Sequence, residues 1–198
     1  MSRWKAAFIH LALSGVAAVA ALALILLLWY PAPFFSALGG QKILLIVLGA
    51  HMTLGPLLTL IIFNAKKSRR ALIFDFSVIA ILQASALIYG MNTMFQARPV
   101  FVVFSRDSFD LITANMLSRE DIAKTRYPDY RSLPLSGPIY VYAEMPTDAK
   151  ERSSLIMSTL SGKDLSQFPQ YYEPYAGHIS AIVGATRPIA ELRKLNPD

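Results

Sequence analysis

The sequence predicts three transmembrane α-helices followed by a small α+β domain with an antiparallel sheet. Three long apolar stretches lie in the first 91 residues of the 198-residue chain, and the whole excess of positive charge lies there too. Residues 1–91 carry seven basic side chains against one acidic side chain, Asp75, whereas residues 92–198 carry twelve of each and are neutral. We therefore expect a three-span bundle over residues 1–91 and a separate domain over residues 92–198.

Each apolar stretch is long enough to cross a bilayer, because a hydrocarbon core of about 30 Å needs roughly 20 apolar residues in a helix. The first stretch has no charged residue and ends in Trp29-Tyr30-Pro31, an aromatic pair typical of the membrane interface followed by a proline that stops the helix. The predicted spans are Ala6–Tyr30, Ile43–Phe63 and Ala71–Met91.

Basic residues in the flanking segments predict the orientation of the chain. Arg3 and Lys5 precede the first span, and the segment Asn64–Arg70 holds four basic residues, whereas Pro31–Lys42 holds only Lys42. Because cytoplasmic loops carry the excess of lysine and arginine, we expect the N-terminus and the second loop in the cytoplasm. Three crossings of a bacterial inner membrane then place the C-terminal domain in the periplasm.

A cleaved signal peptide is the alternative interpretation of the first span. Its basic start fits this alternative, and Ser36-Ala37-Leu38 resembles a cleavage site. The apolar stretch of about two dozen residues exceeds the roughly 7–15 of a signal sequence, which favours a retained span. The periplasmic location of the C-terminal domain is expected in either case.

Composition and motifs exclude several classes of protein. Topology accounts for the basic charge, so we expect no nucleic-acid partner. The chain has no cysteine, so the outer domain must be stable without disulfides. No metal-binding, nucleotide-binding or nucleophile motif is present, so we expect no metal, no cofactor and no enzymatic activity. His178 and Ser180 are near enough to suggest a nucleophile pair, but no third group is in view to orient them.

The outer domain begins with the clearest strand pattern in the chain. Pro99–Phe104 is rich in β-branched and aromatic residues, and the alternating segment Phe109–Ala114 predicts its hairpin partner. Ser118 is expected to cap a short helix, with Asp121 as its partner three residues on. The other predicted elements are a strand over Pro138–Glu144, a helix over Pro146–Leu160 and a last helix over Arg187–Leu195. We expect three or four antiparallel strands covered on one face by helices.

Polar side chains inside the spans are the sharpest local signal, since an ionisable group there costs roughly 2.5–3.5 kcal/mol or more. Depth counted at about 1.5 Å per residue puts His10 and Asp75 near the cytoplasmic side. The same count puts His51 and Gln83 near the midplane. The predicted pairs are therefore His10 with Asp75 and His51 with Gln83. Pro56 is expected to kink the second span and free a backbone carbonyl for a partner.

Two uses of the two pairs remain open. They hold the three helices together by interhelical hydrogen bonds, aided by small residues such as Ser14, Thr59 and Ser85, or some face outward to receive another membrane helix. For Pro56 the alternative is a kink that is merely tolerated in packing. In the outer domain, Tyr171, Tyr172 and Tyr175 have two interpretations, of which the common use of aromatic residues in packing favours the second. They form a peptide-binding surface, or they belong to the core or to a lid.

Several short motifs together resemble a known family. The chain is similar to the type IV pilin accessory proteins of the TfpX/TfpZ kind, which are related to FimB. The family pattern often has an acid at the place of His51, so a role that needs a fixed negative charge there is not expected. The motifs that carry the resemblance are Trp4-Lys5-Ala6, Ile9-His10-Leu11, Leu28–Pro31, Leu54–Leu60, Phe74-Asp75, Gln96–Val100, Val102-Val103-Phe104 and Gly137-Pro138.

The resemblance implies a non-catalytic accessory factor or chaperone of a type IV major pilin, acting in pilin stability and pilus assembly. Its expected partners are the pilin, the lipid bilayer and other assembly components. The expected binding residues are His10, His51, Pro56, Asp75, Gln83, Tyr171, Tyr172 and Tyr175. Asp75 could pair with the pilin's N-terminal amine, in competition with His10. The alternatives are a membrane-bound enzyme that modifies pilin or envelope material, and a transporter subunit that uses the polar midplane residues.

Overall fold

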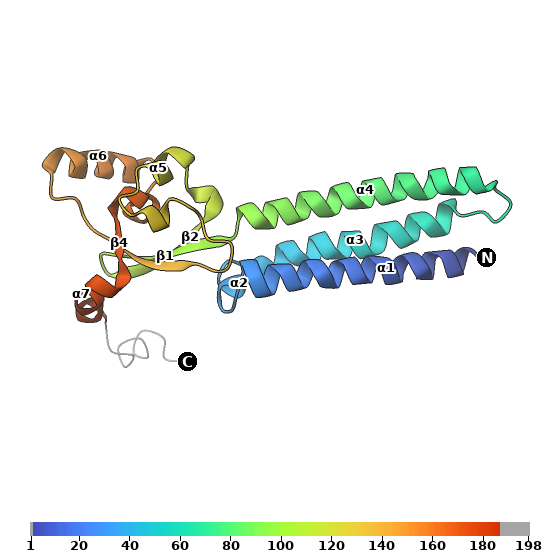
Figure 1. Cartoon of the computed structure of the whole chain (residues 1–198), viewed down its shortest axis with the longest axis horizontal. Helices are drawn as coiled ribbons and strands as arrows, with labels where there is room; N and C mark the ends of the chain where they lie inside the picture. The colour runs from blue at the N-terminus through green and yellow to red at the C-terminus, as the bar shows by residue number, and fades with distance from the viewer. Residues whose placement is uncertain (1, 187–198) are drawn as a thin grey trace. The chain divides into compact units, whose positions relative to one another are not determined.

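The computed structural model describes residues 2–186 and divides the chain between Arg98 and Pro99 into two compact units (Figure 1). This division falls later than the expected boundary after residue 91, because the third long helix continues through Gln96. The helix predicted over Arg187–Leu195 lies outside the described residues.

The first unit consists of three long helices and one short helix. Serine side chains accept hydrogen bonds from the first turns of two of them, Ser2 before the first and Ser68 before the third. All three long helices are long and apolar enough to cross a membrane, which confirms the predicted three stretches. Their bounds are Arg3–Leu24 for α1, extended by a π-helical turn over Ile25–Trp29, Phe34–Ala37 for the short α2, Gly40–Ile62 for α3 and Arg69–Gln96 for α4.

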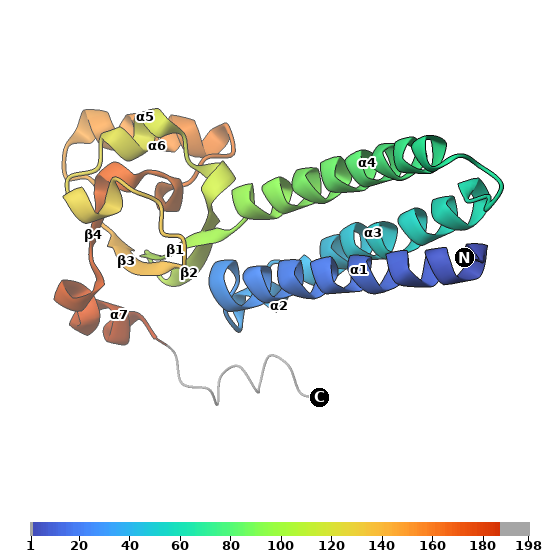
Figure 2. The ribbon, with the colours of Figure 1, turned by 45° about the vertical axis from the view of Figure 1, so that its right-hand side comes forward.

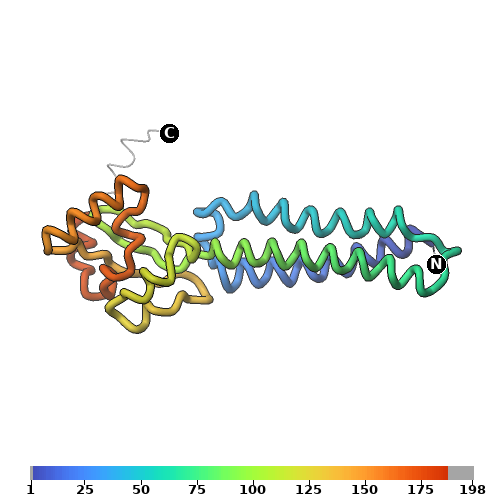
Figure 3. The backbone as a smooth tube through the Cα atoms, turned by 90° about the horizontal axis from the view of Figure 1, so that it is seen from above, coloured from blue at the N-terminus to red at the C-terminus, as the bar shows by residue number. Residues whose placement is uncertain are grey.

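The helix α3 packs against both α1 and α4 (Figures 2 and 3). At the end of the unit that precedes the sheet domain, the hydroxyl of Tyr30 donates a hydrogen bond to the carbonyl of Met94 at 2.8 Å. The ring of Trp29 lies 5.1 Å from that of Phe95. The predicted aromatic pair therefore joins the end of the first helix to α4.

The second unit contains a four-stranded sheet in the order β2-β1-β3-β4. The strands β1 and β2 form the predicted hairpin, and its turn places Arg106 in the left-handed region at φ 58°. Strands β1 and β3 run parallel, while β3 and β4 run antiparallel. The strands are β1 Pro99–Ser105, β2 Ser108–Thr113, β3 Ile139–Ala143 and β4 Tyr172–Pro174.

The expectation of a purely antiparallel sheet was wrong, because the sheet is mixed. Parallel neighbours need a long crossover connection rather than a tight turn. The chain between β2 and β3 provides that connection, and it contains the short helix α5, Arg119–Ala123. Strand periodicity indicates which residues face the core, but it carries no information on strand direction.

The helices α5 and α6 begin at residues whose side chains cap them. Ser118 caps α5 by accepting from the amide of Asp121 at 3.1 Å, as predicted. The helix α6, Ala149–Leu160, is capped by Asp148 and ends before Gly162, which has φ 87°. A further short helix, α7, spans Ile179–Ala185, which the sequence patterns did not predict. One face of the sheet packs in a core with residues such as Phe101, Val103, Val141, Leu155 and Tyr172.

Candidate functional site

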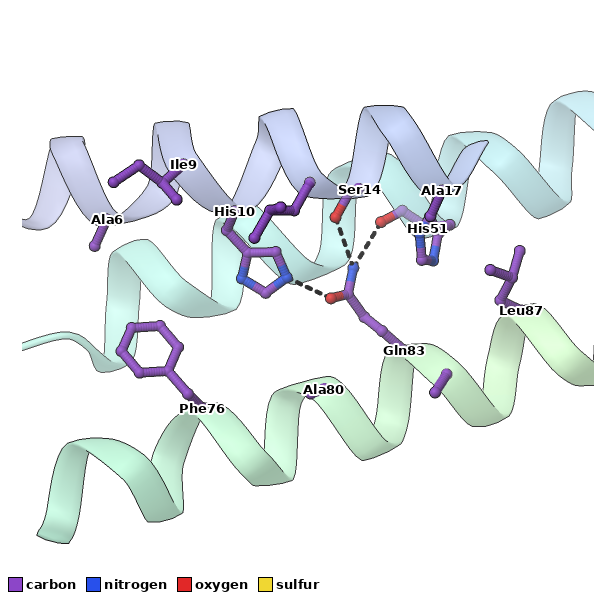
Figure 4. A pocket seen from close by; sticks show the side chains of 12 residues that line it. Ala6, Ile9, His10, Ser14, Ala17, His51, Phe76, Ala80, Gln83 and Leu87 are labelled. Carbon is purple, nitrogen blue, oxygen red and sulfur yellow. Dashed lines mark hydrogen bonds between the residues drawn. The ribbon is translucent and has the colours of Figure 1, made fainter. Parts of the chain in front are cut away.

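A hydrogen-bond network joins the three long helices, and His10 of α1 lies at its centre (Figure 4). Its Nε2 lies 2.5 Å from Oε1 of Gln83 on α4, and its Nδ1 lies 2.6 Å from the hydroxyl oxygen of Thr59 on α3. Each helix therefore contributes one polar side chain to the same point. In apolar surroundings such groups stabilise a bundle by satisfying one another.

The second half of the Gln83 side chain settles which atoms donate. Its amide nitrogen lies 2.8 Å from the backbone carbonyl oxygen of His51 and 3.4 Å from the hydroxyl of Ser14. Because the NH₂ group must donate to that carbonyl, Oε1 accepts on the other side, and Nε2 of His10 carries the hydrogen. In the neutral tautomer with its hydrogen on Nε2, Nδ1 accepts from the hydroxyl of Thr59, so that both nitrogens are satisfied.

The close approach of Gln83 depends on a glycine. A Cβ atom at Gly55 would overlap the carboxamide of Gln83. The next residue, Pro56, lies inside a continuous α3 and has no N–H for the carbonyl of Met52 one turn earlier. The neighbouring carbonyl of His51 receives the bond from Gln83. The carbonyl that Pro56 deprives of its helical donor is thus that of Met52, and the carbonyl that Gln83 contacts is its neighbour, so the use of the freed carbonyl by a partner stays a prediction.

Both predicted side-chain pairs need correction. His10 pairs with Gln83 and Thr59 rather than with Asp75, whose carboxylate lies 2.6 Å from Nζ of Lys67. Gln83 reaches the backbone of His51 and not its ring. The depth count assumed that all helices begin at one level, whereas the contacts set His10, near the start of α1, beside a residue in the middle of α4. Lys67 is one of the four basic residues of Asn64–Arg70, from which the sequence predicted only the orientation of the chain.

The ring of His51 is buried and has no hydrogen-bond partner within residues 2–186. The residue is 9% exposed, and neither ring nitrogen has a hydrogen-bond partner there. It lies at the middle of α3, and its ring projects toward the space between α1 and α4 (Figure 4). A buried polar group without a partner is costly, so it marks a candidate binding position.

A groove of about 540 Å³ lies between α1 and α4, with His51 in its lining (Figure 4). The polar groups of the network form part of its wall, and the rest is apolar. Four of the lining residues are alanines, whose short side chains leave the backbones of α1 and α4 close to the groove. The lining residues are Ala6, Ile9, His10, Leu13, Ser14, Ala17, His51, Phe76, Ala80, Gln83, Ala84 and Leu87.

Three of the predicted site residues are tyrosines in the outer domain, and they have different environments. Tyr172 is fully buried, and its hydroxyl donates to the carbonyl of Ser166 at 2.5 Å. Burial raises the pKa of Tyr172 well above its ordinary value. The core interpretation therefore holds for Tyr172, and a surface contact by this side chain is excluded. Tyr171 is half-buried and lies 6.3 Å from the ring of Phe168.

Tyr175, a predicted site residue, lies in a row of aromatic rings, and the sequence patterns did not single out the other rings of this row. Its ring lies 6.5 Å from Phe109 and 5.8 Å from Tyr140, both about half exposed. Tyr142 stacks on His178 with ring centroids 4.1 Å apart. The alternation of aromatic residues along β3 was the signal that could have indicated this face.

The two units together define a class of protein. Three helices of membrane-spanning length carry a polar network and an apolar groove, and a separate mixed-sheet domain follows them. The chain belongs to the family of fimbrial assembly proteins. The family model described as fimbrial assembly protein FimB matches residues 1–39.

Curated relatives carry the comparison over nearly the whole chain. The fimbrial assembly protein of serogroup E1 of Dichelobacter nodosus is 34% identical over 193 residues, which cover 97% of this chain and 75% of the relative. The serogroup I protein of the same organism is 32% identical over the same shares. The protein of serogroups C1 and C2 is 40% identical over 124 residues, 63% of this chain and 91% of the relative. No solved structure matches the chain significantly.

Proposed function

We propose that this chain is a non-catalytic inner-membrane accessory factor, or chaperone, that binds a type IV major pilin and assists its assembly into the pilus. The observation that carries the proposal is the match of 97% of the chain to a fimbrial assembly protein. A role in fimbrial biogenesis follows from the family. The pilin as client and the chaperone activity are the finer steps proposed here.

The proposed topology follows from the charges that flank the helices. Arg3 and Lys5 at the start of α1, together with the basic residues before α4, are expected in the cytoplasm. The sheet domain is then periplasmic, where the globular part of an exported pilus subunit also resides. A reporter that is active only in the periplasm, fused after Thr186, should be active, and activity of a cytoplasmic reporter there instead would contradict the topology.

Each unit offers a contact of its own to such a client. A pilus subunit in the membrane has an apolar helix, and the groove between α1 and α4 has apolar walls with polar groups that such a helix can address. The exposed rings of Phe109 and Tyr140 offer contact area to a folded subunit domain, because aromatic side chains give large contacts at low entropic cost.

The proposal is tested by in vivo photo-crosslinking in a strain whose own gene is deleted. Full-length variants carry the photoreactive residue at Ala84 in the groove or at Tyr140 in the outer domain, with Leu135, an exposed loop residue of the outer domain, as a control. The pilus subunit should be captured from both test positions, and the deletion should lower subunit level and surface pili. Capture from neither position, with pili unchanged, would contradict the proposal.

The non-catalytic part of the proposal has its own measurement. The mass of the pilus subunit, determined with and without this chain, should be identical, because a non-catalytic factor makes no covalent change to its client. A lipid or glycan mass shift that depends on the chain would establish the alternative function of a membrane-bound modifying enzyme.

A further inference from the structure

The ring of His51 is a hydrogen-bonding group that the three-helix unit does not use. Neither nitrogen has a partner within residues 2–186, although the residue is nine-tenths buried. By contrast, His10 and Gln83, which line the same groove, are satisfied by each other and by their neighbours. An apolar medium makes an unpaired imidazole costly, so its presence at the middle of a spanning helix favours a partner from outside the chain.

The shape of the groove favours a helix as that partner. On α1 the lining runs from Ala6 to Ala17, and on α4 it runs from Phe76 to Leu87, which is about 16 Å, or three turns, along each helix. The four alanines Ala6, Ala17, Ala80 and Ala84 lie in the walls. Small residues let the backbone of another helix approach closely, as in other membrane helix pairs. A lipid acyl chain would fill the groove but would leave the imidazole unpaired.

The charges of the unit specify the chemistry of the partner side chain. Two imidazoles line the groove, and no acidic residue does. The single acid of the unit, Asp75, is engaged by Lys67 at 2.6 Å. A carboxyl group facing an imidazole makes a pair that is neutral overall whichever of the two holds the proton, which keeps the cost of burial in lipid low.

We infer that the groove between α1 and α4 receives a transmembrane helix of a partner protein, which presents a carboxyl group near its midpoint to the ring of His51. The inference deepens the proposed function and rests on it for the placement of α1, α3 and α4 in a bilayer. Because the protein's own atoms cover both ring nitrogens, the aliphatic side chains of the groove shift when the partner helix enters.

The proposed binding role of His51 can be tested without changing the stability of the fold. Its ring makes no hydrogen bond in the described chain, so replacing it by leucine, which has a similar volume, removes an unpaired polar group without breaking a contact. The backbone carbonyl that Gln83 uses is kept by this variant. His51→Leu is therefore expected to fold like the original chain and to differ only in binding.

Synthetic membrane peptides test the inference directly. The full-length protein is reconstituted in phosphatidylcholine vesicles with 21-residue leucine–alanine helices that carry a central Glu, Gln or Leu, and binding is measured by energy transfer. The Glu peptide should bind about five- to tenfold more tightly than the Leu peptide, the effect of one interhelical hydrogen bond. In His51→Leu this difference should disappear, while thermal melting of the protein is unchanged.

Other results would overturn the inference. Equal binding of the Glu and Leu peptides would show that the ring has no role, and equal binding of the Glu and Gln peptides would remove the carboxyl group from the assignment. A preference for Glu that persists in His51→Leu would place the contact elsewhere. Because these peptides are not pilus subunits, the outcome is independent of whether a pilin is the natural client.

A crosslinking comparison in cells tests the location of the partner. Ala80 and Ala84 lie in the groove, whereas Leu82 lies on the opposite side of α4 between them and is 58% exposed. A photoreactive residue at Ala80 or Ala84 should capture a membrane protein of a different mass, and the same residue at Leu82 should not. Capture of a second copy of this chain, of lipid alone, or of the same protein from Leu82 would each contradict the inference.

Discussion

Replacing Gly55 by alanine should break the polar network, although Gly55 itself has no side chain in it, because the added methyl group displaces Gln83. A Cβ atom at this position would occupy the space of the Gln83 carboxamide, so that Gln83 must withdraw. It would then lose its hydrogen bonds to the ring of His10, to the carbonyl of His51 and to Ser14. Interhelical hydrogen bonds in membrane proteins average roughly 0.6 kcal/mol each, so we expect a loss of about 2 kcal/mol.

The same substitution should be nearly neutral when Gln83 is absent. In a Gln83→Ala background there is no carboxamide to displace, so Gly55→Ala should cost less than about 0.5 kcal/mol. The residue before Pro56 is restricted in both backgrounds, so the comparison cancels that effect. Gly49→Ala is the matched control on the same helix, because nothing lies within 4 Å of a Cβ atom there.

The assay is reversible unfolding of the full-length chain in detergent micelles, followed by energy transfer between labels on α3 and α4. A double-mutant cycle gives the coupling between Gly55 and Gln83 directly. An equal cost of Gly55→Ala in both backgrounds would refute the proposed collision. A neutral result in the original background would show that the network contributes nothing to the association of α4 with α3.

Three further variants probe other parts of the molecule. His10→Leu should destabilise the helical unit in the same assay, because it removes the hydrogen-bond partner of Gln83 and Thr59. His51→Leu should not, because the ring of His51 makes no hydrogen bond within residues 2–186. Equal effects of the two substitutions would contradict this assignment of partners. Tyr172→Phe should lower the stability of the outer domain by about 1 kcal/mol, since its buried hydroxyl bonds the carbonyl of Ser166, and tyrosine circular dichroism during melting measures it. Lys163→Met should destabilise that domain at pH 7, and its cost should shrink as the pH falls below about 4. Burial acts to raise the pKa of Asp121, but hydrogen bonds from Lys163 and Ser118 outweigh it and hold that pKa below its ordinary value. The stability from this pair is therefore complete above about pH 4 and declines as the pH falls through the lowered pKa, and a cost of Lys163→Met that does not decline on acidification would contradict the reasoning.

The elements that could be predicted are those with signals inside one segment. Apolar length located the three long helices, and alternation located the β1–β2 hairpin. Ser118 marked the start of α5 through a local hydrogen bond, and the predicted helix over Pro146–Leu160 contains α6. Each of these signals depends on neighbours within a few residues, so the folded chain could not alter it greatly.

The features that could not be predicted depend on how segments meet. The partner of His10 is set by the relative level of α1 and α4, which residue counting from assumed membrane faces misjudged. The parallel pairing of β1 with β3 is set by the crossover between them. The two tyrosines Tyr171 and Tyr172 are adjacent in sequence, yet Tyr172, the first residue of β4, is fully buried, whereas Tyr171, the last residue of a 3-10 turn, is only partly buried against the core.

The contacts that α4 makes with the rest of its unit explain why a groove remains between α1 and α4 and what a helix bound there would do. Few residues of α4 are buried, and it meets α3 closely where Gly55 admits Gln83 and where Gly90 lies against Val47. In the proposed bilayer there is no hydrophobic drive to press α4 further against α1, so these contacts are expected to set its position and to leave the groove beside them. A helix bound in the groove would supply the contacts that α4 lacks, and it would stabilise the unit in proportion to its affinity. Because such coupling is reciprocal, the chain would stabilise the bound helix to the same extent. A protein built in this way would both protect its client and depend on it, so its own level in the membrane should fall when the client is absent.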